Sequence, residues 1–388
     1  MIPIIDFTNF EAHEERTGEE LYEACRDVGF VYLKGCFDEE RIKEMCDWVR
    51  RSGDRTCSFK QDADGTAHNL VLQSNKFFDL PEDVKQKAPH PPEGWKHRGY
   101  SGVGLEQISK VDVSPRYFGL VDPLEWVLRR LLSQNVNKGT PQKSATLPDY
   151  KESFDFGTEG DPVLENVWLP GMIHQISLHS QLNWWIAEEY LPGFRAVAVK
   201  FYQDMRQVQL KVLRALAIGF PGLDSEFFER CHENGDNQLR LLHYPSAPLS
   251  AFEHVGRCAP HSDFGTCTFL FQDDVGGLEI EDPNHAGVFI PAKPISGTIV
   301  FNLGDFLRHI SNDTLKSTRH RVLAPPQGQN KDGKTPERFS MAYFCGGDRE
   351  KVIDVLPGSY GPNNPRKYEP ISVSQYIDMR MNALYSKE

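Results

Sequence analysis

The chain lacks several features that would assign it to a protein class at once. Its eight cysteines are scattered, and no Cys-x-x-Cys pair occurs among them. This gives little support to a zinc cluster or a disulfide framework and indicates reduced thiols. No apolar run approaches the roughly 20 residues that a membrane helix needs, and the N-terminal segment lacks the basic and apolar regions of a secretory signal. A cytoplasmic protein without a membrane partner is therefore expected.

Basic residues are also fewer than acidic ones. The chain has 43 Lys and Arg against 55 Asp and Glu, which gives a formal net charge of −12. An acidic balance argues against a nucleic-acid surface as the partner, and it keeps a protein in solution. With 388 residues, of which 39% are hydrophobic, the chain can bury the core of one large domain or of two closely packed ones.

The sequence pattern changes at about residue 235. Before residue 235, apolar periodicity predicts strands at 2–7 and 30–33 and helices at 19–29 and 201–220, and residues 182–190 also read as helical. After residue 235, short β-rich runs follow one another with turn residues between them. Such a series is typical of a sandwich or barrel. The runs are 238–244, 266–272, 277–281, 298–303, 319–322 and 338–345.

The motif His261-Ser-Asp263, followed by His320, indicates a metal site. Two imidazoles and one carboxylate form the ligand set of non-haem Fe(II) oxygenases, which leaves coordination positions open. If a strand carries the motif, its alternation puts His261 and Asp263 on one face. An H-x-D triplet also occurs by chance, so the rest of the chain has to support it. No Ser-His-Asp or Cys-His arrangement suggests a nucleophile, and we expect no catalytic side chain beyond the metal ligands.

Arg338 and Ser340 share one face of the run 338–345, and Phe339 and Met341 share the other. A guanidinium with a neighbouring hydroxyl suits a carboxylate, because Arg supplies two charge-assisted hydrogen bonds and Ser a third donor. The alternative is an arginine on a solvated strand face.

Arg240, Leu242 and Tyr244 share a face of the run 238–244. Tyr244 either places its hydroxyl near the metal pocket or is an ordinary half-buried tyrosine. His243 falls on the opposite face, which indicates a structural role. Asp305 follows a glycine, and we interpret it as a turn residue that caps the next segment.

Together, these motifs resemble the isopenicillin-N-synthase-like branch of the 2-oxoglutarate/Fe(II)-dependent dioxygenases. The resemblance covers most of the chain, and several motifs are most similar to fungal thymine 7-hydroxylase and related fungal biosynthetic hydroxylases, which implies a role in secondary metabolism. The matching segments, in order, include IPIIDF, ACRDVGFVYLKG, KFFDLPEDVK, HRGYSGVGLE, KESFDFG, RLLHYP, HSDFGTCTFLFQD, GGLEIED, GTIVFNLGDFL, SNDTLKSTRHRV and RFSMAYF.

The resemblance implies an α+β fold with a double-stranded β-helix core (a cupin-like jelly roll) and flanking α-helices. It suggests four regions along the chain. These are an N-terminal α/β dioxygenase region at 1–165, a helical connector with an insertion at 166–235, the jelly-roll core that holds Fe(II) and 2-oxoglutarate at 236–350, and a C-terminal helical segment at 351–388.

The family's site residues carry over to matching positions. His261, Asp263 and His320 match the iron ligands. Arg338 and Ser340 match the pair that holds the distal carboxylate of 2-oxoglutarate. A further co-substrate residue is Tyr244, which matches the tyrosine of the family's Asn-x-Tyr-Pro element. Leu242 stands where that element has asparagine.

Arg240 and Phe344 match residues that face the primary substrate, which implies a small, planar, oxygen-rich organic molecule. The implied reaction consumes O2 and 2-oxoglutarate, releases succinate and CO2, and hydroxylates or oxidatively rearranges the substrate. Two alternatives stay open: an Fe(II) oxidase of the same fold that does not use 2-oxoglutarate, and a non-catalytic binding module.

Two stretches look longer than the family pattern, at 118–148 and 170–190. Each is either surface decoration or a lid or oligomer contact. A homo-oligomer is therefore possible. The identity of the substrate, and the choice between hydroxylation, desaturation, cyclisation and ring expansion, do not follow from the motifs.

Overall fold

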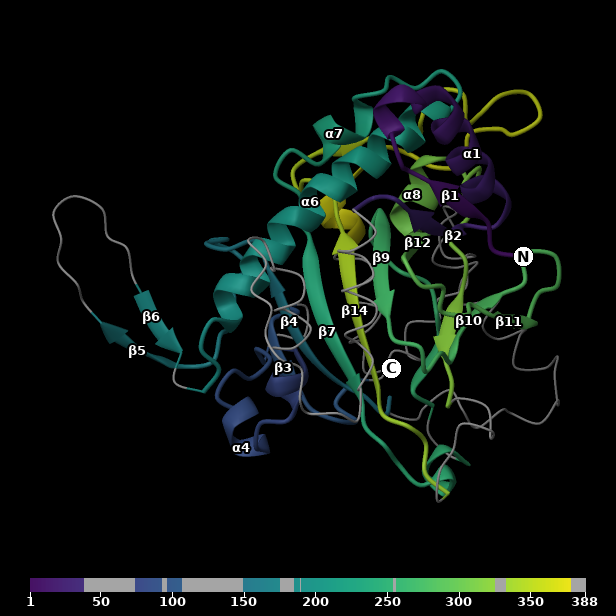
Figure 1. Cartoon of the computed structure of the whole chain (residues 1–388). Helices are drawn as coiled ribbons and strands as arrows, with labels where there is room; N and C mark the ends of the chain where they lie inside the picture. The colour runs from purple at the N-terminus through teal and green to yellow at the C-terminus, as the bar shows by residue number, and fades with distance from the viewer. Residues whose placement is uncertain are drawn as a thin grey trace, which may run out of the picture.

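Two β-sheets that face each other form the centre of the molecule (Figure 1). The computed structural model describes residues 1–37, 74–92, 96–106, 149–174, 185–188, 190–253, 256–324 and 333–377. The larger sheet has the order β1 (Ile4–Asp6), β2 (Phe30–Lys34), β12 (Thr298–Leu303), β9 (Cys267–Gln272), β14 (Arg338–Cys345), β7 (Gln238–Tyr244), β4 (Glu152–Gly157) and β3 (Gly99–Ser101). The smaller sheet has the order β11 (Phe289–Pro291), β10 (Leu278–Glu281), β13 (His320–Val322) and β8 (Cys258–His261).

From β7 onward the chain passes repeatedly between the two sheets. Strands β7, β9, β12 and β14 belong to the larger sheet, and β8, β10, β11 and β13 belong to the smaller one. The ladders between these strands are antiparallel. This alternation is how a double-stranded β-helix is wound, so the predicted α+β fold with a jelly-roll core is confirmed.

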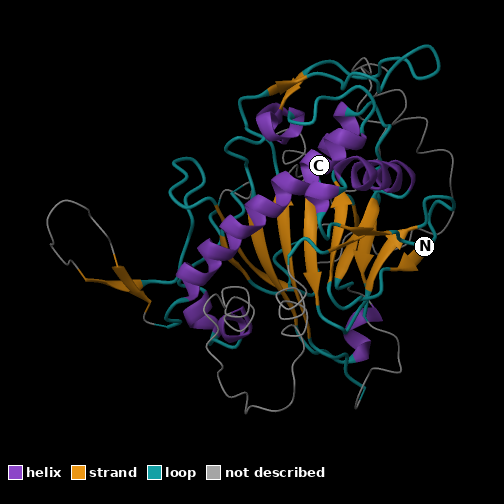
Figure 2. Cartoon of the chain, turned by 45° about the horizontal axis from the view of Figure 1, so that its top comes forward, coloured by secondary structure: helices purple, strands orange, loops and turns teal. Residues whose placement is uncertain are grey.

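The outer face of the larger sheet is apolar and lies under a long helix. Leu241, Met341 and Tyr343 point to this face and belong to one buried cluster with α6 (Phe194–Gly219). Figure 2 shows α6 running across the strands of the sheet. Helix α1 (Glu14–Asp27) packs against α6. The two helices approach each other closely at glycines, because a side chain at Gly219 would overlap the carbonyl oxygen of Gly18.

The inner face of the larger sheet meets the smaller sheet around a second buried cluster. Tyr32, Val300 and Ala342 project from the larger sheet, and Leu278 and Ile280 project from the smaller one. Because successive side chains of a strand alternate between faces, each polar residue on this inner face projects into the space between the sheets.

Short elements complete the fold. They are η1 (Phe10–Ala12), α4 (Glu82–Lys85), β5 (Gly171–His174), β6 (Trp185–Glu188), α7 (Phe227–Cys231), η5 (Leu249–Glu253), α8 (Asp305–Ile310), β15 (Val352–Ile353) and β16 (Ile371–Ser372). Within the described ranges, no helix is long and apolar enough to cross a membrane.

The helix predicted at 182–190 is wrong. Within this stretch, Trp185–Glu188 forms strand β6, which pairs with β5 from Gly171 opposite Glu188 to His174 opposite Trp185. The resulting hairpin projects from the body of the molecule (Figure 1). In the C-terminal region, β15 pairs with β16, and the helical segment predicted at 351–388 stays a prediction. The stretch 118–148 lies outside the described residues, and the division into four regions stays a prediction.

His243 lies on the outer face of β7, as strand alternation predicts, within a charged network. Its Nδ1 is 2.6 Å from Glu152 Oε1, and its Nε2 is 2.6 Å from Glu337 Oε1. Lys85 Nζ lies 2.7 Å from the other Glu152 oxygen. The imidazole of His243 stacks on Phe339, with ring centroids 4.5 Å apart. Burial opposes the charged form, but the hydrogen bonds to the two carboxylates outweigh it and raise the pKa of His243.

A raised pKa of His243 ties stability to pH. The charged imidazole stabilises the fold at pH values below its unfolded pKa, and this contribution is lost as pH rises through the higher folded pKa. We expect His243→Gln to reduce the free energy of unfolding on the order of 1 kcal/mol at pH 6 and by less at pH 8.5. Chemical denaturation across this range measures the difference. The control is His285→Gln, because His285 pairs with Asp282 at an exposed turn. A difference between wild type and His243→Gln that does not change with pH would contradict the assignment.

Candidate metal centre

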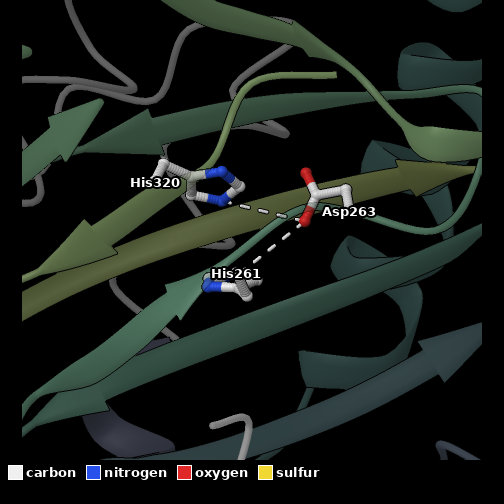
Figure 3. Close-up of side chains that lie close together, drawn as sticks. All are labelled: His261, Asp263 and His320. Carbon is white, nitrogen blue, oxygen red and sulfur yellow. Dashed lines mark ion pairs between the residues drawn. The ribbon is translucent and has the colours of Figure 1, made fainter. Parts of the chain in front are cut away.

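The two histidines of the predicted metal site come from neighbouring strands of the smaller sheet. His261 is the last residue of β8, and His320, the first residue of β13, is its register partner. Their ring centroids are 4.3 Å apart. Asp263 Oδ1 lies 3.9 Å from His261 Nε2 and 3.8 Å from His320 Nε2 (Figure 3). One ligand atom from each residue lies within 4.8 Å of the other two.

These separations suit a shared metal ion. They are too long for direct hydrogen bonds, yet short enough for one cation to contact all three groups. Two imidazole nitrogens and one carboxylate oxygen are also the donor set that selects iron in oxygenases with open coordination positions. The residues present therefore fit Fe(II).

The backbone sets the orientation of both imidazoles. A carbonyl oxygen only accepts, so Nδ1 of His261 donates to the carbonyl of Ala259 at 2.8 Å, and Nδ1 of His320 donates to that of Thr318 at 3.3 Å. Each Nε2 then keeps its lone pair for a metal. Burial and the neighbouring His261 lower the pKa of His320 to about 4, so its ring is neutral at physiological pH.

Asp263 is held by residues that the motif analysis did not single out. Strand β8 ends at His261, so strand alternation does not position Asp263, contrary to expectation. Its Oδ2 accepts hydrogen bonds from Thr268 Oγ1 at 2.6 Å and from Asn302 Nδ2 at 2.7 Å. Thr268 and Asn302 are register partners on β9 and β12. They leave Oδ1 directed at the histidines. Burial would raise the pKa of Asp263, but His320, His261 and these hydrogen bonds keep it lowered.

Asp305 also supports the loop after His261. It occupies the first turn of α8, and its Oδ2 accepts a hydrogen bond from Ser262 Oγ at 2.9 Å. Its backbone N–H donates to the carbonyl of Asp263 at 2.8 Å. Gly304 makes this approach possible, because a side chain there would overlap the carbonyl of Gly265.

The predicted co-substrate residues come together on the inner face of the larger sheet. Arg338 on β14 is the register partner of Tyr244 on β7, and its guanidinium lies 4.8 Å from the centre of that ring. Arg338 Nη1 is 3.1 Å from Ser340 Oγ, and both side chains are buried. Gln272 of β9, which the motifs did not indicate, accepts from Nη2 at 3.5 Å. Leu242 lies opposite Ser340.

Arg240 lies on the same face, but its charge is already paired. Its Nε is 2.6 Å from Asp155 Oδ1 on β4, and its Nη1 is 3.0 Å from Glu106 Oε2. Lys151 Nζ shares that Glu106 oxygen at 2.8 Å. Phe344, the other predicted substrate residue, shares this face of β14 and is half-buried. No local pattern indicated the carboxylates around Arg240, because they come from distant segments.

Two family models match the chain. The model for the 2OG-Fe(II) oxygenase superfamily matches residues 235–347. The model described as the N-terminal region of non-haem dioxygenases in morphine synthesis matches residues 60–171. The first match includes the three predicted metal ligands and both residues of the Arg-x-Ser pair.

Curated and solved proteins agree with these matches. The 2-oxoglutarate-dependent dioxygenase frbA of Dothideomycetidae sp. is 35% identical over 364 residues, which cover 92% of this chain and 88% of that protein. The proline hydroxylase buaE of Petromyces alliaceus is 34% identical over 389 residues, with 98% of each chain covered. A crystal structure of the thymine 7-hydroxylase of Neurospora crassa with α-ketoglutarate and thymine superposes with a TM-score of 0.71 at 32% identity, covering 99% of this chain and 97% of that one.

These findings confirm the predicted resemblance to fungal biosynthetic dioxygenases and to thymine 7-hydroxylase. They also confirm the predicted cofactors, which are Fe(II), 2-oxoglutarate and O2. The chain belongs to the 2OG-Fe(II) oxygenase superfamily and is a 2-oxoglutarate-dependent dioxygenase.

Proposed function

We propose that His261, Asp263 and His320 are the protein ligands of the catalytic iron. The observation that carries this proposal is the convergence of two imidazole nitrogens and one carboxylate oxygen within 4.8 Å of one another. When bound, Fe(II) supplies the oxidative chemistry that couples decarboxylation of 2-oxoglutarate to oxidation of a substrate C–H bond. The protein contributes fixed ligand orientation, because backbone carbonyls hold the imidazoles and Thr268 and Asn302 hold the carboxylate.

Arg338, Ser340 and Tyr244 then bind the distal carboxylate of 2-oxoglutarate. The support is electrostatic: Arg338 is 1% exposed, and it donates to a carbonyl, a hydroxyl and an amide oxygen. A buried guanidinium with neutral partners favours an anion, since burial makes an uncompensated charge costly. In an oxidase that does not use 2-oxoglutarate, the same residues would bind the substrate's own carboxylate.

Arg240, Asp155 and Glu106 form the Arg240 cluster. The primary substrate contacts both the guanidinium and the carboxylates of this cluster. The family resemblance implies that a planar, oxygen-rich molecule stacks on Phe344 and pairs with Arg240. The contacts of Arg240 with Asp155 and Glu106 refine this proposal, because the cluster offers carboxylate acceptors beside its N–H donors. It therefore suits a small ring compound that carries both carbonyl and N–H groups. Thymine, bound in the Neurospora crassa structure, has both groups, and the amino acid proline, for which the proline hydroxylase is named, carries an N–H and a carboxylate.

Other expectations stay predictions. They are a cytoplasmic location, the absence of nucleic-acid and membrane partners, a possible homo-oligomer and a lid or contact role for 170–190. The choice between hydroxylation and another oxidative outcome depends on where the substrate's C–H bond lies relative to the iron, at a scale of about 3–3.5 Å.

The metal assignment predicts graded losses of iron binding. Asp263→Ala removes a ligand, and we expect anaerobic Fe(II) titration to show affinity at least about 100-fold below wild type. Thr268→Val keeps the ligand but removes one hydrogen bond that orients it, so we expect a loss of about 10-fold. Asp282→Ala, which removes an exposed turn carboxylate, is the control. Equal Fe(II) affinity in wild type and Asp263→Ala would remove the basis of the site.

The substrate assignment predicts separable effects of Arg240. Candidate substrates, beginning with pyrimidine bases, proline derivatives and oxidised aromatic compounds, are identified by the succinate they release. With such a substrate, we expect Arg240→Lys to lower kcat/KM by about 10-fold or more, because lysine lacks the planar fork but still neutralises Asp155. Uncoupled decarboxylation of 2-oxoglutarate should change less than about twofold.

Two outcomes would contradict these proposals. A parallel fall of both activities in Arg240→Lys would place Arg240 at the co-substrate or in the fold. Turnover that proceeds unchanged without 2-oxoglutarate, and without succinate formation, would favour the oxidase alternative for the Arg338 site.

A further inference from the structure

Arg257 is a fully buried arginine whose guanidinium is only partly satisfied. It immediately precedes β8 and is 0% exposed. One nitrogen, Nη2, donates to the carbonyl of Pro336. Within the part of the chain that the structure describes, Nε and Nη1 have no hydrogen-bond partner. Buried polar groups nearly always find partners, so two nitrogens of a buried guanidinium without an acceptor indicate a missing acceptor.

Arg257 lies beside the proposed co-substrate site. Its guanidinium is 5.8 Å from the centre of the Tyr244 ring, and that of Arg338 is 4.8 Å from the same ring. Both guanidiniums therefore adjoin one aromatic side chain on the inner face of β7. Tyr244 itself is 2% exposed, so the ring that both cations adjoin lies in an environment with little water.

Asp273, a buried carboxylate at this end of the barrel, makes its hydrogen bonds to backbone groups and not to either arginine. Asp273 accepts hydrogen bonds from the backbone N–H groups of Phe339 at 2.7 Å and Val275 at 3.0 Å. Burial raises the pKa of Asp273 to about 6, and burial together with the charge of Arg338 lowers the pKa of Arg257 to about 10. Arg257 therefore stays charged at pH 7, and among the described residues two guanidiniums adjoin the Tyr244 ring in this region.

Ring contacts alone do not account for Arg257. Its guanidinium also lies 5.9 Å from the Phe252 ring, and such contacts favour a buried cation. They leave the in-plane N–H groups at Nε and Nη1 unused, however. Arg240 provides the contrast within the same barrel, because its nitrogens meet two carboxylates. Arg257 has the donors and the charge for an anion that the described part of the chain does not itself supply.

We propose that Arg257 is a second arginine of the site that holds the distal carboxylate of 2-oxoglutarate, where its free N–H groups complete the contacts made by Arg338 and Ser340. This inference rests on the proposed co-substrate site. A carboxylate has about four acceptor positions, enough for donors from two guanidiniums and a hydroxyl. Arg257 would thereby favour 2-oxo acids that carry a second carboxylate.

Removing the carboxylate from the ligand tests the proposal. Calorimetry on the full chain loaded with Mn(II), without turnover, gives Kd for 2-oxoglutarate and for 2-oxopentanoate, which has the same carbon chain but no distal carboxylate. We expect Arg257→Met to weaken 2-oxoglutarate binding by about 10- to 100-fold and to leave 2-oxopentanoate binding unchanged within about twofold. Arg257→Lys, which keeps the charge but not the fork, should fall between wild type and Arg257→Met.

Controls separate this inference from the site assignment. Arg321→Met removes an arginine that stacks on Phe289 and pairs with Glu279, and it should leave both Kd values unchanged. Arg338→Met should also reduce the preference for the second carboxylate. If Arg338→Met reduces it and Arg257→Met does not, Arg257 is not part of the site. If neither does, the proposed co-substrate site fails as well.

A purely structural role for Arg257 has a different signature. It would weaken both 2-oxo acids equally, together with Mn(II) affinity and the unfolding temperature, and this result would overturn the inference. If Arg257→Met does not fold, the binding of the two ligands to Arg257→Lys tests the proposal instead. A selective loss of 2-oxoglutarate binding of about threefold or more supports the proposal, and an equal loss for the two ligands contradicts it.

Discussion

The alternation of side chains across the larger sheet is the constraint on which the rest of the molecule depends. In β14, Phe339 and Met341 face the apolar layer under α6, whereas Arg338 and Ser340 face the smaller sheet. A shift of one residue in register would exchange these faces, burying a guanidinium under the helix and placing phenylalanine in the site. The apolar contacts that hold α6 on the sheet therefore also hold the site residues in place, so fold stability and site geometry have a common origin.

This constraint is local, which is why part of the site could be predicted from the sequence. The alternation of side chains along a strand placed Arg338 and Ser340 on one face, and Tyr244 and His243 on opposite faces. Both predictions are confirmed in the structure. The iron ligands were predicted from residue type and family resemblance. The reasoning about Asp263 was wrong, because β8 ends before it and its orientation comes from Thr268 and Asn302. Those contacts depend on how β9 and β12 pair, which no local pattern encodes.

Long-range pairing also explains the other failures. Residues 182–190 have a helical pattern, yet Trp185–Glu188 is a strand because Gly171–His174 provides a partner. Tertiary pairing of this kind regularly overrides local propensity. Arg240 was expected to bind the substrate, but the β4–β7 ladder places Asp155 directly opposite it. A sequence reveals a cation at an inward position. Only the register of the neighbouring strand reveals whether that cation is already neutralised.

Three buried arginines of the barrel, Arg240, Arg257 and Arg338, thus differ in what they can still bind. To bind a substrate, Arg240 has to give up its contacts with Asp155 and Glu106. The net binding free energy that it gains from a simple anion is therefore small. A ligand with hydrogen-bond donors of its own suits the cluster better, because those donors can pair with the two carboxylates. Arg338 and Arg257 have no carboxylate partner to give up among the described residues. Their burial lowers the stability of the protein when no ligand is bound. A bound dicarboxylate offsets that cost in the folded state alone. The co-substrate should therefore stabilise the fold as well as supply electrons for the reaction, and the protein should be least stable when it is empty.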